Sequence, residues 1–150
     1  MSKSIPTTLS QEQIAFINDK PLILLSTVDA ETNTPNTSAI SWVKAYSESA
    51  IRFAVTSNSR TAANVKANPR VSLTMIGLGT VTSIVGNAKI LAEKMEGVAM
   101  PLTKIEVEIE GVFDSMFWGA AITQNPDYEK TTNVEKAKAL DEQVFAALLS

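Results

Sequence analysis

Alternation of apolar and polar residues is the strongest pattern in this chain, and it is clearest in the stretch TKIEVEIEGVFDS near the middle of the second half. Ile105, Val107 and Ile109 fall on one side of an extended chain, and the charged residues from Lys104 to Glu110 fall on the other. This period of two predicts a strand with its apolar side chains turned to a core and its charged side chains turned to solvent. Alternating or continuously apolar runs predict six strands, at 21–29, 37–47, 50–56, 70–76, 80–92 and 103–115.

A helical period replaces this alternation towards both ends of the chain. Residues 10–19 predict a short helix, in which Ser10 and Gln13 form a capping box. Residues 133–149 predict a longer amphipathic helix. Its apolar stripe consists of Val134, Ala137, Leu140, Val144, Phe145 and Leu148.

A third helix is predicted among the strands, at 61–67. Ser59 is a good N-cap for it, and Asn68 before Pro69 disfavours its continuation. Strands and helices do not alternate along the chain, so a parallel sheet is not expected. The pattern predicts a mainly β fold with flanking helices, in which antiparallel strands close into a small barrel and residues 1–150 form a single domain.

Composition then narrows the chemistry. The chain has no Cys and no His, which excludes disulfides, Cys/His zinc sites, Ser-His-Asp triads and His-ligated haem. A net charge of −3 without a basic stripe argues against nucleic acid as a partner. No apolar run approaches about 18 residues, so no membrane span is expected. The first residues lack an apolar signal core, so a cytoplasmic location is expected. Any catalysis here is expected to borrow its chemistry from a cofactor.

A polar cluster stands where a strand enters the third helix, in the stretch TSNSRTAANVKANPRVSLTM, residues 56–75. A helix amino terminus stabilises an anion, and Ser57, Ser59 and Thr61 add short donors. Arg60 adds a guanidinium suited to phosphate. These residues fit a phosphate monoester. The alternative is that Ser59 only caps a surface helix while Arg60 is solvated, and the pattern alone favours that alternative.

The same stretch resembles a known family. FAVTSNSRTAANVKANPRVSL is similar to the matching segment of the FMN-binding split β-barrel proteins, the pyridoxamine 5'-phosphate oxidase-like family. The resemblance extends over about residues 10–118 and includes PLILLSTVD, PNTSAISWV and GNAKI. It implies a six-stranded antiparallel split β-barrel, FMN as the cofactor, and a homodimer with the flavin at its two-fold interface.

The resemblance also implies a set of cofactor-binding residues. Carried over position by position, they are Ser41, Trp42, Val43, Val55, Thr56, Ser59, Arg60, Thr61, Thr82 and Trp118. In this assignment Arg60 holds the phosphate, and Trp118 reaches the site from the second subunit. Each tryptophan also has a plainer interpretation, which is core packing for Trp42 and dimer packing for Trp118. No side chain is singled out as catalytic.

Departures from the family pattern limit what can be inferred about function. Thr61 stands where the family has a phosphate-binding Lys, and Ala39 stands where many members have an Arg. Lys66 is a candidate to replace the missing charge. The Arg-x-His element of the true oxidase is absent, so pyridoxamine 5'-phosphate oxidation is rejected. We expect an FMN-dependent oxidoreductase acting on an unknown small molecule. The alternatives are a non-enzymatic module that binds or senses a flavin or another phosphorylated ligand, and a barrel that has lost its cofactor and serves as an interaction protein.

Overall fold

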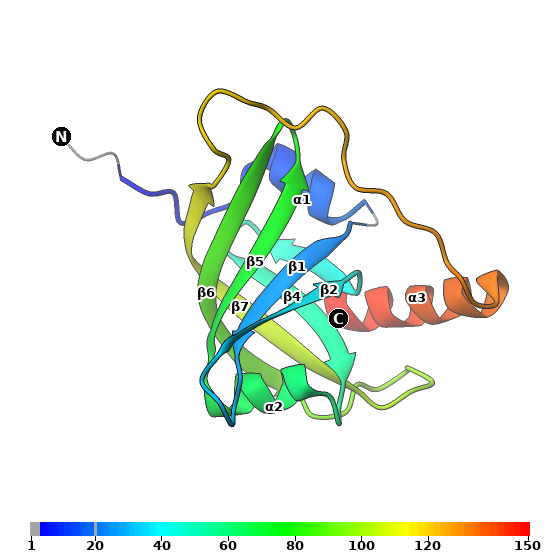
Figure 1. The fold of residues 1–150 in the computed structure, drawn as a ribbon. Coiled ribbons are helices and arrows are strands. Elements are labelled where there is room, and N and C mark those ends of the chain that lie inside the picture. Colours follow the sequence, from blue (N-terminus) through cyan, green and yellow to red (C-terminus); the bar gives the residue numbers. More distant parts are fainter. Residues whose placement is uncertain (1–3, 20) are drawn as a thin grey trace.

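The computed structural model describes residues 4–19 and 21–150, and Figure 1 shows its fold. Within the described residues, seven antiparallel strands form one sheet, and three helices accompany it. In chain order the elements are α1 (Gln11–Ile17), β1 (Ile23–Val28), β2 (Pro35–Ile40), β3 (Val43–Ser47), β4 (Ala50–Thr56), α2 (Arg60–Ala67), β5 (Arg70–Gly77), β6 (Thr80–Ala92), β7 (Leu102–Asp114) and α3 (Val134–Leu149). No helix that these residues form is long and apolar enough to cross a membrane.

The two edge strands of the sheet are neighbours in the sequence. The strand order is β2-β1-β5-β6-β7-β4-β3, so β2 and β3 lie at opposite edges. Only Ser41 and Trp42 separate them along the chain. Three Cα–Cα steps of about 3.8 Å span at most about 11 Å, so the edges cannot lie farther apart than this where the chain crosses. The sheet is therefore rolled, and we call Ser41–Trp42 the edge junction.

The strand count differs from the prediction at this junction. The sequence predicts one strand over 37–47, whereas the structure has two, because the two halves pair with different partners. Ile40 of β2 lies opposite Ile23 of β1, and Val43 of β3 lies opposite Phe53 of β4. In the sequence Ile40 and Trp42 continue one alternation, so the pattern does not reveal the change of partner. In the structure the alternation changes phase at the junction, because Ile40 and Val43 both pack in the barrel core whereas Trp42 packs in a separate apolar cluster. The mainly β antiparallel fold is confirmed, but the sheet is rolled rather than closed and has seven strands, not six.

Apolar side chains from the strands fill the inside of the rolled sheet. Ile105, Val107 and Ile109 of β7 are buried there, as the alternation predicts. The register shifts at Gly86 of β6, as predicted for a bulge. Ile17 of α1 joins the same core, and the Ser10–Gln13 capping box is present. Figure 1 shows α1 and α2 near opposite ends of the sheet, so short helices cover both openings.

The last helix packs on the outer face of the sheet, against β3 and β4. Val144 and Leu148 form a second apolar cluster with Ala54, Met95 and Leu102. The predicted stripe is wrong at its first position, because Val134 is 63% exposed. Val134 is the first residue of α3, and Figure 1 shows the first turn of this helix extending past the sheet.

Two charged residues of β7 are paired with distant parts of the chain rather than fully solvated, and Glu106 accepts from Arg52 Nε at 3.0 Å. Lys104 is buried and Glu106 is half-buried, which corrects the prediction that both are solvated. Lys104 Nζ donates to the carbonyl of Ser150 at 3.0 Å, and Arg52 Nη1 donates to the carbonyls of Leu148 and Ser150 at 3.0 and 2.8 Å. Burial, with the positive charge of Arg52 nearby, lowers the pKa of Lys104. These donors satisfy carbonyls at the carboxyl end of α3 and hold the helix against the sheet.

Candidate functional site

A cavity of about 310 Å³ lies beside the edge junction, between the end of β4 and the start of α2. We call it the junction hollow. Six of the residues that the resemblance assigns to the cofactor line it, namely Ser41, Trp42, Val55, Thr56, Ser59 and Thr61. They come from the junction, from β4, and from the turn and first residues of α2, so the fold brings together three separate parts of the chain. Lys130, which the sequence did not suggest, lines the same hollow.

The turn into α2 is held by hydrogen bonds of its own. The Ser59 hydroxyl accepts from the Ala62 N–H at 3.1 Å, which is the predicted N-cap. The Ser59 N–H donates to the Thr56 carbonyl at 3.0 Å. The Ser57 hydroxyl turns away and donates to the Glu93 carbonyl at 3.0 Å. The hollow therefore has a rigid wall with hydroxyl groups and the positive end of a helix dipole, an arrangement that favours an anion.

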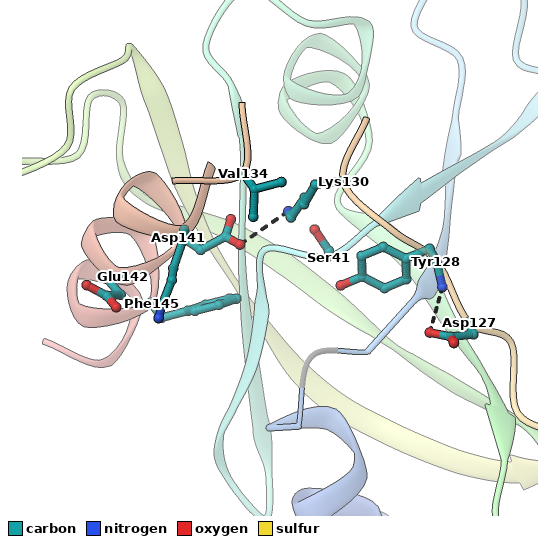
Figure 2. Close-up of a pocket in the computed structure, with 9 residues that line it drawn as sticks. Ser41, Asp127, Tyr128, Lys130, Val134, Asp141, Glu142 and Phe145 are labelled. Atoms are coloured by element: carbon teal, nitrogen blue, oxygen red, sulfur yellow. Dashed lines mark hydrogen bonds and ion pairs between the residues drawn. The ribbon is translucent and has the colours of Figure 1, made fainter. Parts of the chain in front are cut away.

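Trp42 is tied to the last helix by a polar chain that Figure 2 displays in part. Its indole Nε1 donates to Asp141 Oδ1 at 2.8 Å, and Asp141 Oδ2 lies 3.2 Å from Lys130 Nζ. We call these residues the Trp42–Asp141–Lys130 chain. It links the edge junction to α3 and to the segment that precedes α3. Sequence reasoning missed Asp141 because a carboxylate on an amphipathic helix is usually solvated, and missed Lys130 because its segment has no periodicity.

A larger cavity of about 520 Å³ adjoins the junction hollow and shares Ser41 and Lys130 with it. Figure 2 shows its lining, with the rings of Tyr128 and Phe145 on either side and charged side chains between them. We call it the aromatic hollow. A third cavity, of about 340 Å³, is lined in part by Trp42, Lys130 and Asp141. The edge junction thus borders a set of neighbouring cavities with the volume typical of small-molecule sites.

Arg60 lies outside the junction hollow. Its side chain is 74% exposed, and its Nε lies 3.8 Å from Asp29 Oδ2, across a different and smaller cavity. Hydrogen bonds from the backbone N–H groups of Thr32 and Glu31 lower the pKa of Asp29, and Arg60 adds to this. An exposed pair at this distance is weak, so Arg60 can leave Asp29 at little cost.

The other assigned residues also lie elsewhere. Val43 is fully buried in the barrel core and does not line the junction hollow. Thr82 is buried on β6 opposite Met75 and Asp114. Trp118 follows β7 and is 97% exposed. Within one chain, these three do not join the residues that line the junction hollow.

Lys66, the sequence candidate for the missing positive charge, is also engaged elsewhere. Its Nζ lies 3.0 Å from Glu93 Oε2, and it does not line the junction hollow. Lys130 is the one residue with a charged side chain among the described residues that do line it. No group of three or more Asp or Glu residues in the described part of the chain is arranged to hold a metal ion.

Comparison with known proteins identifies the family. The sequence model of the pyridoxamine 5'-phosphate oxidase family matches residues 9–138, and the chain therefore belongs to that family. This confirms the resemblance seen in the sequence. No curated protein matches the chain.

Several solved structures share the fold. HupZ from Group A Streptococcus is 18% identical, with a TM-score of 0.61 over 76% of this chain and 98% of its own. A structure described as an F420 reductase is 17% identical, with a TM-score of 0.59 over 70% of this chain and 98% of its own. HutZ from Vibrio cholerae, described as a heme storage protein, is 16% identical, with a TM-score of 0.54 over 71% of this chain and 94% of its own. At these identities the likeness establishes the fold alone.

The Trp42–Asp141–Lys130 chain is testable through stability. Trp42→Phe keeps a ring at the junction but removes the indole N–H, which leaves Asp141 Oδ1 without its donor. We expect a loss of about 1–2 kcal/mol in the free energy of unfolding, measured by urea denaturation. Tyr46→Phe is the matched control, and no change is expected there because the side chain is 46% exposed and the variant keeps the ring that lies over Arg52. Equal stability of the Trp42 variant and the wild type would contradict a structural role for the hydrogen bond.

Proposed function

We propose that the junction hollow binds FMN and that the protein is a flavin-dependent oxidoreductase acting on a small molecule. The observation that carries this proposal is the gathering of six family-matched positions, from three parts of the chain, around one cavity. Membership of the pyridoxamine 5'-phosphate oxidase family supports it.

The lining of the hollow fits the two ends of FMN. Trp42, Ala54 and Val55 offer apolar surface to the isoalloxazine ring, and Ala39 leaves space where a larger side chain would intrude. Thr56, Ser59 and Thr61 offer hydroxyl groups beside the start of α2, where a phosphate is stabilised. Apolar walls with a few polar groups at one end are typical of cofactor sites.

Arg60 is proposed as a further phosphate ligand. It is the first residue of α2, directly after Ser59, and its pair with Asp29 is long and exposed. Because solvent screens an exposed pair at this distance, releasing it costs little. A bidentate bond to phosphate is stronger because both partners are charged and the geometry matches.

The flavin, when bound, supplies the hydride or electron transfer. The residues of the chain bind and orient it, and they shape the space beside the ring. The aromatic hollow adjoins the junction at Ser41 and is the proposed space for the substrate, because it is large enough for a small molecule and has both apolar and charged walls. Pyridoxamine 5'-phosphate is not proposed as that substrate, because the chain has no His and lacks the Arg-x-His element.

A non-enzymatic module that binds a flavin or another phosphorylated ligand is the second candidate. The absence of basic residues at Ala39 and Thr61 favours this second candidate. Fewer basic residues imply weaker binding of the FMN phosphate, and an enzyme needs to keep its flavin through repeated turnover. Haem is a poorer candidate ligand, since the chain has neither His nor Cys to ligate the iron. Oxidation of reduced nicotinamide by the FMN-loaded protein separates an enzyme from a carrier.

Preference for FMN over riboflavin tests the proposed phosphate anchor. We expect FMN to bind at least about tenfold more tightly, because only FMN has a phosphate for Arg60 and the hydroxyl groups. Arg60→Ala is expected to weaken FMN binding and leave riboflavin binding unchanged. Arg70→Ala is the matched control, because it removes another exposed arginine that is paired with a carboxylate, and it is expected to change neither affinity. Titration of flavin fluorescence measures all of these affinities. Equal affinity of the wild type for the two flavins would remove the phosphate anchor.

A homodimer is also proposed, with Trp118 reaching the site of the second subunit. Phe117 and Trp118 are exposed together after β7, and such a pair is suited to burial against a partner. Light scattering is expected to give twice the 16.1 kDa of one chain at micromolar concentration. The Trp118→Ala variant is expected to remain a dimer and to bind FMN more weakly. A monomeric wild type would contradict the shared site, and a variant that loses the dimer but keeps its FMN affinity would make Trp118 an interface residue only.

A further inference from the structure

Lys130 has a central position among the cavities of this protein. It lines the junction hollow, the aromatic hollow and the third cavity beside Trp42. It belongs to the segment between β7 and α3, far in sequence from the turn that carries Ser59 and Thr61. The fold nevertheless brings it to the same hollow as those two residues.

Its ammonium group is held from one side. Asp141 Oδ2 lies 3.2 Å from Lys130 Nζ, and the other oxygen of Asp141 accepts from the Trp42 indole at 2.8 Å. The Lys130 side chain is 33% exposed, so it is neither fully solvated nor sealed. An ammonium has three N–H donors. Its ion pair with one carboxylate oxygen leaves the remaining N–H groups for a ligand.

The partner carboxylate does not border the junction hollow. Asp141 lines the aromatic hollow and the third cavity, whereas Lys130 lines those two and the junction hollow as well. Lys130 is therefore the one charged residue among the described residues that line the junction hollow, and no carboxylate residue lines it.

We propose that Lys130 is a phosphate-binding residue, which supplies from the C-terminal segment the positive charge that Thr61 does not provide. This inference rests on the proposed function, because the ligand it assigns to the hollow is a phosphate monoester of the FMN type. Asp141 pairs with this ammonium and, through the Trp42 indole, ties it to the edge junction. Lys66 is not chosen for this role, because it does not line the hollow and its 3.0 Å pair with Glu93 is closer than the 3.8 Å pair of Arg60 with Asp29.

Paired lysine variants test the inference. Lys130→Met removes the charge at the hollow, and Lys138→Met removes a charge from the aromatic hollow only. We expect Lys130→Met to raise the Kd for FMN roughly tenfold to a hundredfold and the Kd for riboflavin less than about twofold. Lys138→Met is expected to change both by less than about twofold. Lys130→Arg is expected to retain most of the FMN affinity. Lys130→Gln, which keeps a donor for Asp141, is expected to behave like Lys130→Met and serves if that variant does not fold.

The possible outcomes are distinct. Suppose that the wild type binds FMN more tightly than riboflavin. If Lys130→Gln then weakens FMN binding no more than Lys138→Met does, or not at all, the inference is wrong and the proposed function stands. If Lys130→Gln weakens riboflavin as much as FMN, Lys130 shapes the hollow and does not hold the phosphate. If the wild type binds neither flavin, the proposed function fails and this inference fails with it. Melting temperatures measured on the same samples confirm that the variants are folded.

Discussion

The structure depends on one constraint, which is that two residues join the two edges of a seven-stranded sheet. β2 pairs with β1 at one edge, and β3 pairs with β4 at the other, yet only Ser41 and Trp42 lie between them. The sheet has to roll until its edges meet there. Rolling creates the enclosed core, and it also places the short junction between β2 and β3 beside the turn into α2. The candidate site lies where the chain crosses between the edges, and this explains why parts of the sequence that are far apart contribute to it.

The last helix completes this site from outside the barrel. Arg52 and Lys104 donate to the carbonyls at its carboxyl end, while Val144 and Leu148 pack on the outer face of the sheet. With the helix held at that end, Asp141 meets the Trp42 indole and pairs with Lys130. A buried cation whose hydrogen-bonding capacity is used by helix carbonyls is consistent with a fixed position for the helix. The C-terminal part of the chain is thus a wall of the cavity system as well as a cover for the barrel.

The sequence could predict what depends on local pattern. Alternation identified the strands, and Ser59 and Pro69 marked the ends of α2. The polar turn pointed to Ser59 and Thr61, which line the junction hollow, but also to Arg60, which does not. The other lining positions came from the family resemblance. What the sequence could not predict depends on partners far away in the chain. The break at Ser41–Trp42 is hidden because Ile40 and Trp42 continue one alternation in the sequence, although only Ile40 packs in the barrel core. Lys104 and Glu106 looked solvated because their partners lie far away in the chain, at Ser150 for Lys104 and at Arg52 for Glu106. Lys130 and Asp141 were missed because each looks like an ordinary surface charge until the fold brings them to Trp42.

The central claim is that the junction hollow holds a flavin with its ring along Ser41–Trp42 and its phosphate near Ser59, Thr61 and Lys130. A crystal structure of the protein soaked with FMN tests this most directly, because it locates both ends of the ligand at once. The account predicts electron density for the ring against the junction and for the phosphate within hydrogen-bond distance of the Lys130 ammonium and the start of α2. Flavin density at another place on the molecule, or a reversed ligand with its phosphate in the aromatic hollow, would contradict it.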